Sequence, residues 1–156
     1  MGVPNINGLV PISIGRPSIK FLQAMGVPMP QGSNRPTPKE VSLTVNQKIL
    51  FVSDLQDEWS NPLITLWRGS GDCEDFVLLK RALLLSVGWK DEDLVMLVGY
   101  DKVLREEHAV LLVRIASGWI FLDNRNDLAL RLEKLTDFTP VKAYTATNSW
   151  LYGSQR

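Results

Sequence analysis

The sequence predicts an α+β fold in which N-terminal helices pack on an antiparallel sheet. Two helix starts carry capping signals, at Thr37 and at Asp72, and apolar residues follow each of them at helical spacing. Farther along the chain, two alternating segments over 108–115 and 119–123 flank a short turn and indicate a β-hairpin. One side of this hairpin is wholly apolar and is therefore expected to pack on the helices.

The composition excludes several classes of protein. The 156 residues suit one domain that buries a core without disulfides, and the single cysteine excludes an internal disulfide. The 17 basic and 17 acidic residues balance, so no basic field exists to draw nucleic acid, and we expect no nucleic-acid partner. No apolar run approaches the roughly 18 residues of a membrane span, so no span is expected.

The chain divides into an N-terminal arm, residues 1–36, and a domain, residues 37–156. The arm holds six of the nine prolines, which remove backbone donors and interrupt regular structure. The first twenty residues lack the basic-then-apolar layout of a signal peptide. We therefore expect a periplasmic location if an export signal was removed and a cytoplasmic one otherwise.

The elements of the domain are expected in the following order. A capping box at 37–40 opens a first helix that runs to about Leu55, with Val41, Val45, Ile49 and Val52 on one face. Residues 57–62 end it, and residues 63–68 lead into glycines. A second helix runs from about Cys73 to Val87 and stops at Gly88. There follow a turn over 89–93, a strand over 94–100, a charged connection over 101–107, the hairpin, a turn over 124–127, an irregular or briefly helical segment over 128–138, and a last strand over 139–146.

The hairpin places two polar residues on one side. If Ser117 and Gly118 form a two-residue turn, one face is apolar, with Ala109, Leu111, Val113, Ile115, Ile120 and Leu122. The opposite face then carries His108 and Asp123. In that register these two lie about four residues apart, or ~13 Å at ~3.3 Å per residue, so a bulge, a strong twist or a longer turn must bring them into contact.

Cys73 is the candidate nucleophile. It stands where the second helix begins, and the positive end of a helix dipole favours thiolate, the reactive form. The alternative is a small buried apolar residue, which is the commonest role of a lone cysteine. Three flanking carboxylates, Asp72, Glu74 and Asp75, make an inert core position less favourable.

Cysteine, histidine and a carboxylate are the minimum set for thiol-based acyl transfer. The chain offers Cys73 at a helix start, then His108 and Asp123 on successive strands, which is the papain-like order of elements. Taken singly, His108 could be a structural strand-end residue and Asp123 a turn former. Their joint occurrence in this order favours a catalytic triad. For the oxyanion, the backbone amide of Cys73 is the expected donor, and Trp59 either lines the cleft or belongs to the core.

The acids around Cys73 are candidate ligands of a divalent cation. Asp72, Glu74 and Asp75 would raise the pKa of the thiol, and a bound cation would offset their charge. An oxygen-only ligand set favours a hard ion, and hence calcium rather than zinc. The alternative is that these acids only cap the first helical turn.

Three motifs resemble those of the bacterial transglutaminase-like cysteine proteinases, over roughly Val41 to Gly153. They are Gly-Asp-Cys-Glu-Asp-Phe at 71–76, His-Ala-Val-Leu at 108–111 and Leu-Asp-Asn at 122–124. The resemblance implies a papain-like or transglutaminase-like core, a triad of Cys73, His108 and Asp123, and peptide-bond hydrolysis. It also implies calcium at Asp72 and Glu74. The best-known members are periplasmic proteases that release a surface adhesin under the control of a regulatory receptor, which suggests such a substrate and partner.

Two other functions fit the same residues. The triad could pass the acyl group to an amine, as in a transglutaminase or amidase, because the pocket around the thioester decides between water and amine. Alternatively, the fold could be a catalytically silent binding module in which the acids hold a metal. An intact triad argues against the silent module, so we expect a cysteine endopeptidase with a protein substrate.

Overall fold

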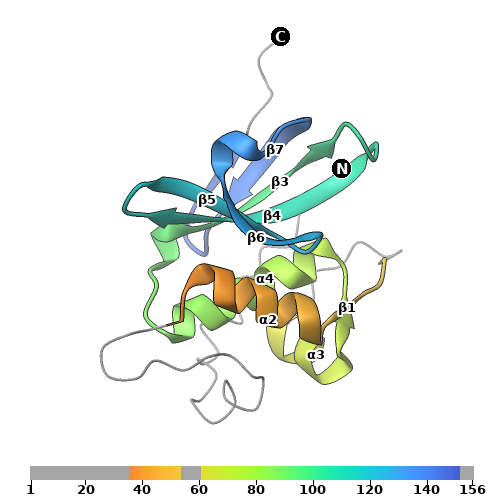
Figure 1. Cartoon of the computed structure of the whole chain (residues 1–156), viewed down its shortest axis with the longest axis vertical. Coiled ribbons are helices and arrows are strands. Elements are labelled where there is room, and N and C mark those ends of the chain that lie inside the picture. Colours follow the sequence, from red (N-terminus) through yellow and green to blue (C-terminus); the bar gives the residue numbers. More distant parts are fainter. Residues whose placement is uncertain (1–35, 54–60, 152–156) are drawn as a thin grey trace.

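The computed structural model describes residues 36–53 and 61–151, and in them three helices lie against one side of a six-stranded sheet (Figure 1). Residues 1–35 of the predicted arm and Trp59 lie outside the described residues. The helices are α2 (Pro38–Lys48), α3 (Pro62–Arg68) and α4 (Cys73–Ser86), with short 3-10 turns η3 (Asp91–Asp93) and η4 (Leu132–Lys134). The strands are β1 (Leu50–Phe51), β2 (Ser70–Gly71), β3 (Leu94–Asp101), β4 (Glu106–Ile115), β5 (Gly118–Asp123), β6 (Asn126–Arg131), β7 (Phe138–Tyr144) and β8 (Ser149–Leu151).

The large sheet is antiparallel throughout, in the order β6-β5-β4-β3-β7-β8. Its helix-facing side carries the predicted apolar residues, among them Leu111, Val113 and Leu122, which are fully buried with the residues of α2 and α4. The α+β class and the helix-packed face of the hairpin are therefore confirmed. Within the described residues, no helix is long and apolar enough to cross a membrane.

The centre of the other side of the sheet is also buried, which the sequence pattern did not predict. Val110, Leu112 and Phe121 form a second apolar cluster there, with Val95, Leu97 and Ala143 from neighbouring strands. The strands β3 and β4 are consequently apolar on both faces over most of their length. A sheet buried on both sides holds the strand ends that carry functional residues more rigidly than one open to solvent.

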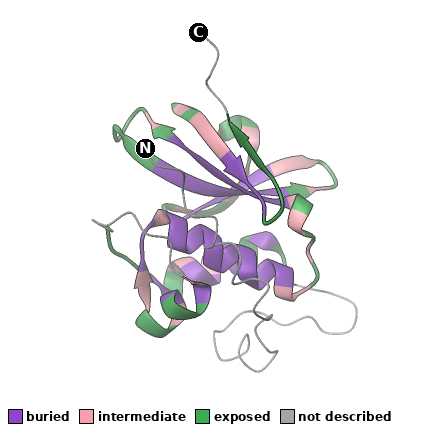
Figure 2. Ribbon diagram, turned by 180° about the vertical axis from the view of Figure 1, so that it is seen from behind, coloured by how far each residue is buried: buried purple, intermediate pink, exposed green. Residues whose placement is uncertain are grey.

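Helix α4 is the centre of the helical layer and is buried along most of its length (Figure 2). It begins at Cys73, as predicted, and it ends at Ser86, close to the predicted Val87, with Gly88 following at a φ of 102°. This positive φ is a conformation that glycine adopts without strain. Even Lys80 and Arg81 in its middle are fully buried.

Three predicted boundaries were wrong. Helix α2 ends at Lys48 rather than near Leu55, because the chain after Ile49 turns into β1 and pairs with β2. Residues 62–68 form helix α3, capped by Asn61, whose side chain accepts from the Leu63 amide at 2.9 Å. Residues 126–131 form the edge strand β6 rather than a turn and an irregular segment. The predicted last strand is β7, and β8 follows it.

Strand β1, which follows α2, pairs in parallel with β2, which directly precedes α4. Leu50 pairs with Ser70 and Phe51 with Gly71, and the Val52 amide donates to the Gly71 carbonyl at 2.8 Å. Because Gly71 lies two residues before Cys73, this pairing places Phe51 beside the start of α4. Both residues of β1 are exposed.

Candidate active site

A reciprocal capping box fixes Cys73 at the first turn of α4. The Asp72 side chain accepts from the Asp75 amide at 3.1 Å, and Asp75 Oδ2 accepts from the Asp72 amide at 3.2 Å. Gly71 is required next to this box, since a Cβ there would lie 2.6 Å from the Asp75 Cβ. The predicted capping role of Asp72 is therefore present, and it fixes Cys73 as the first residue of α4.

His108 and Asp123 are brought together by the register of β4 and β5. The turn consists of Ala116 and Ser117, one residue earlier than expected, so that Ile115 pairs with Gly118. This shift moves Asp123 two positions closer to His108 along the strands, and the β5–β6 pairing is irregular between Phe121 and Asp123. As a result His108 Nε2 lies 2.9 Å from Asp123 Oδ1, with both side chains buried.

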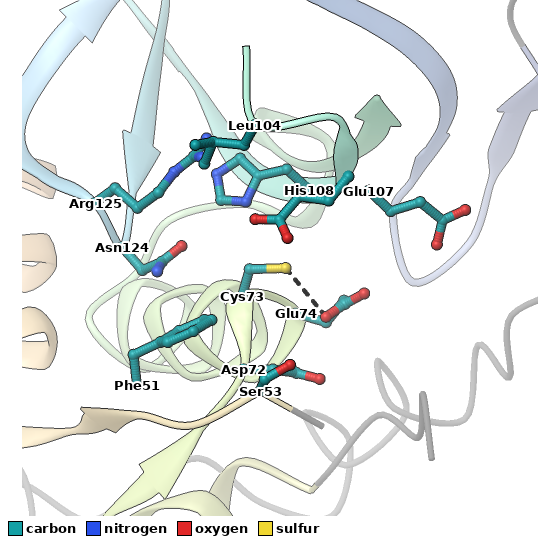
Figure 3. A pocket seen from close by; sticks show the side chains of 11 residues that line it. Phe51, Ser53, Asp72, Cys73, Glu74, Leu104, Glu107, His108, Asn124 and Arg125 are labelled. Carbon is teal, nitrogen blue, oxygen red and sulfur yellow. Dashed lines mark hydrogen bonds between the residues drawn. The ribbon is translucent and has the colours of Figure 1, made fainter. Parts of the chain in front are cut away.

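Cys73 and His108 line the same pocket, which has a volume of about 480 Å³. Figure 3 shows the thiol of Cys73 below the imidazole of His108, with Phe51 and Asn124 on one side and Glu74 on the other. The remaining lining residues are Ser53, Asp72, Leu104, Glu106, Glu107 and Arg125. Cys73 is partly exposed, so a substrate that enters the pocket can reach the sulfur.

The thiol of Cys73 donates to Glu74 Oε2 at 3.2 Å. Burial raises the pKa of Cys73 well above its usual range, and the charge and the hydrogen bond of Glu74 raise it further, against an opposing contribution from the Ala109 backbone. These contributions favour the protonated thiol over the thiolate. The helix dipole that was expected to favour thiolate is outweighed by burial and by the adjacent carboxylate.

The three acids around Cys73 have different environments. Burial, together with the charges of Glu74 and Asp75, raises the pKa of Asp72 to about 8. Asp75 also pairs with Arg68 at 3.3 Å and does not line the pocket, whereas Asp72 and Glu74 do. The buried carboxylates suit a hard cation, although the described part of the chain shows no group of three or more His, Cys, Asp or Glu residues that could hold a metal ion by themselves.

Asp123 is held as a carboxylate. Burial opposes its ionisation, but the hydrogen bond and charge of His108, followed by the backbone N–H and guanidinium of Arg125, outweigh burial and lower the pKa of Asp123. An ionised carboxylate only accepts hydrogen bonds, so Nε2 of His108 must carry the proton that it shares with Asp123. In the neutral ring, Nδ1 is then left as the acceptor, and it is the nitrogen available to a thiol.

Some pocket residues were not among the candidates from the sequence. Phe51 arrives through the β1–β2 pairing and Leu104 through the turn between β3 and β4, neither of which has a motif. Asn124 and Arg125 had a signal, because they directly follow Asp123 and a residue that follows a catalytic strand end lies at the site edge. Trp59, the candidate cleft residue, lies outside the described residues.

A cysteine at a helix start, facing a histidine and an aspartate on adjacent antiparallel strands, defines the papain-like class of cysteine peptidases. The chain belongs to the bacterial transglutaminase-like cysteine proteinase (BTLCP) family, whose model matches residues 31–154. The family prediction and the transglutaminase-like fold are therefore confirmed. No curated protein matches the chain in sequence.

Solved structures give the same fold. Legionella pneumophila LapG is similar in both its EGTA-treated and its calcium-bound structures, each with a TM-score of 0.68 and 26% identity over 74% of this chain. The chain spans 65% and 67%, respectively, of the length of those two chains. A protein from Cytophaga hutchinsonii has a TM-score of 0.53 at 17% identity, covering 92% of this chain and 54% of that one, and it shows the shared fold alone.

Proposed function

We propose that this protein is a cysteine endopeptidase that uses Cys73 as nucleophile, His108 as base and Asp123 as the residue that orients His108. The observation that supports this most directly is the 2.9 Å contact between His108 Nε2 and Asp123 Oδ1, at a pocket that His108 shares with Cys73. Membership of the cysteine proteinase family supports the same reaction.

The first half of the reaction makes a thioester. The S–H proton of Cys73 passes to His108 Nδ1, and the sulfur bonds to the carbonyl carbon of the substrate peptide. Asp123 stabilises the imidazolium that results and keeps the ring in one orientation. The backbone amide of Cys73 is the expected donor to the oxyanion. When the C–N bond breaks, the leaving amine takes the proton from His108.

The second half restores the enzyme. Water attacks the thioester carbon while His108 takes one of its protons, the C–S bond breaks, and the sulfur regains a proton from His108. The products are a carboxylic acid and the free thiol of Cys73. For the first half to start, the S–H of Cys73, which donates to Glu74, must turn toward His108.

We propose calcium as a cofactor, held by Asp72 and Glu74. Both carboxylates lie at the pocket, and burial together with the neighbouring acids raises the pKa of Asp72 to about 8, so the ionised form of Asp72 lacks a compensating positive charge. Asp75 was also predicted as a ligand, but it does not line the pocket and its Oδ2 accepts from the Asp72 amide and pairs with Arg68, so Asp72 and Glu74 are the better ligands. Bound calcium would supply the positive charge that offsets these acids. A calcium-bound structure of Legionella LapG supports the ion.

The substrate is a protein, as the family indicates. A surface adhesin as that substrate, and a regulatory receptor as a second partner, stay predictions that rest on the family resemblance. The open pocket beside Cys73 is compatible with an extended peptide segment. A comparison of new peptide termini in a bacterial proteome treated with wild type or with Cys73→Ala would identify the substrate.

The same comparison tests the activity. We expect wild type with calcium to generate new termini and Cys73→Ala and His108→Ala to generate none, while both variants keep the fold by circular dichroism. An added primary amine that appears in the products would indicate acyl transfer rather than hydrolysis. Turnover retained in Cys73→Ala would refute the proposed mechanism.

A further inference from the structure

Arg125 joins two carboxylates that come from different parts of the fold. Its backbone N–H donates to Asp123 Oδ1 at 3.0 Å, and its Nε lies 3.6 Å from the same oxygen. Its Nη2 donates to Asp101 Oδ2 at 2.8 Å. The side chains of Asp123 and Asp101 are 10% and 14% exposed, so both ion pairs are partly shielded from water.

Asp101 also stabilises the turn between β3 and β4. Its Oδ1 accepts from the backbone amides of Val103 and Leu104, both at 2.9 Å. The turn contains Arg105 at a φ of 58°, a left-handed conformation that needs such local support. Leu104 lines the pocket although its side chain is half exposed, and Figure 3 shows it on the same side of the pocket as Arg125 and His108.

Among the described basic groups close to Asp123, Arg125 is the one that is partly exposed to solvent. His108 contacts Asp123 from β4, and Lys80, fully buried in α4, interacts with both Asp123 and Asp127. Arg125 is the group that bridges Asp123 to a residue outside this cluster, because its other partner is Asp101. A planar guanidinium can hold two carboxylates in fixed directions, whereas a lysine ammonium cannot.

We propose that Arg125 is a positioning residue that couples the catalytic Asp123 to the turn that presents Leu104 to the substrate. This inference rests on the proposed peptidase function. Arg125 keeps Asp123 in place as the acceptor for His108, and through Asp101 it fixes Leu104 at the rim of the pocket. Leu104 is then the contact for an apolar substrate side chain next to the scissile bond.

The test uses the full chain with Arg125→Gln, Arg125→Lys and Asp101→Asn. Arg114→Gln is the matched control, because Arg114 makes a similar ion pair with Asp93 at 2.6 Å on the surface. The carboxyl carbon of Asp123, followed by carbon-13 NMR over a pH series, reports its ionisation without any substrate. The values of kcat and KM are measured on a peptide identified from the proteome comparison.

We expect Arg125→Gln to shift the Asp123 titration to higher pH and to lower kcat by about 10- to 100-fold, as small misplacements of catalytic groups do. Arg125→Lys should restore the titration through its charge but not the full kcat. Asp101→Asn should mainly raise KM for peptides with an apolar residue at the Leu104 contact. In the double variant, Asp101→Asn should change kcat and KM by less than it does alone, since both substitutions break the same Arg125–Asp101 ion pair.

An Arg125→Gln protein with a wild-type Asp123 titration and the same kcat and KM as Arg114→Gln would overturn the proposal, even if its Tm is lower. Full additivity of Arg125→Gln and Asp101→Asn would overturn the coupling. If Arg125→Gln does not fold, the other two variants still test the proposal: wild-type kcat in Arg125→Lys together with wild-type KM in Asp101→Asn would overturn it. A wild type that cleaves no peptide would contradict the proposed function, whereas the NMR titration would still test the link to Asp123.

Discussion

The thiol of Cys73 donates its hydrogen to the carboxylate of the next residue, Glu74, across 3.2 Å. This contact holds the nucleophile in its unreactive form, because a nearby negative charge disfavours thiolate. His108 lies at the same pocket and is held by Asp123, so the proposed base is in place while the thiol donates to Glu74. The reactivity of Cys73 should therefore depend on the charge of Glu74.

The first prediction concerns Glu74→Gln. Loss of this charge should lower the pKa of Cys73 and speed its alkylation by iodoacetamide at neutral pH in metal-free protein, about tenfold for each unit by which the pKa falls. Glu106→Gln, which removes an acid from the outer part of the same pocket, is the control and should alter the rate little. Equal rates in the two variants would mean that burial alone sets the pKa of Cys73.

The second prediction concerns Asp123→Asn. An asparagine offers an NH₂ donor as well as an acceptor oxygen and carries no charge, so it no longer fixes the proton on Nε2 of His108, and peptidase activity should fall in the direction of the ~10⁴-fold loss seen in serine triads. Asp123 has a lowered pKa, so its contribution to stability is present above the unfolded pKa of 3.8 and is lost as pH falls through the folded value. The variant should consequently be less stable than wild type at pH 7, and the difference should shrink in acid. A variant with wild-type kcat would remove Asp123 from the mechanism.

The sequence was sufficient to predict the elements whose periodicity is strong. Helix α4, its cap at Asp72 and the apolar face of the hairpin followed from spacing, because burial on one face imposes that spacing. Helix α3 is only seven residues long and has apolar residues on both its sides: Leu66 packs on the core, whereas Leu63, Ile64 and Trp67 are exposed, so its sequence shows no clear apolar stripe.

The contact between His108 and Asp123 depended on a detail that periodicity does not determine. A turn at Ser117–Gly118 and one at Ala116–Ser117 leave the same residues on the same faces of the hairpin. The two turns differ in register: each residue of β5 pairs with a β4 residue two positions away from its partner in the other register. Gly118 takes a φ of 128° as the first residue of β5 rather than within the turn. Spacing alone could not separate the three acids near Cys73 either, because Asp72, Glu74 and Asp75 are all carboxylates in one helical turn and differ in their partners and in whether they line the pocket.

The third prediction tests the two sides of the hairpin. Val113 is fully buried against the helices, so Val113→Asp should unfold the domain by placing an unpaired charge in the core. The neighbouring Arg114 has a side chain that is 51% exposed, and Arg114→Asp should lower Tm only slightly, through loss of its pair with Asp93 and repulsion by that residue. Similar thermal denaturation of the two variants would contradict the assignment of faces.

The last prediction concerns Asp72, pH and calcium. Burial and the neighbouring acids raise the pKa of Asp72 from 3.8 to about 8, so between these values the folded protein binds a proton that the unfolded chain has lost. The free energy of unfolding of metal-free protein should therefore fall as pH rises through this window. Calcium competes with that proton, so its addition should raise Tm more at pH 8 than at pH 5 and should release protons on binding.

Asp72→Asn isolates the charge from the cap, because an asparagine oxygen still accepts the Asp75 amide at the start of α4. The variant should lose both the fall in stability with pH and the calcium-dependent rise in Tm, whereas Glu92→Gln, at an exposed acid in η3, should keep both. Calorimetric titration at pH 8 measures the binding directly. A calcium-dependent rise in Tm that is as large in Asp72→Asn as in wild type would place the ion elsewhere and leave Asp72 with the capping role alone.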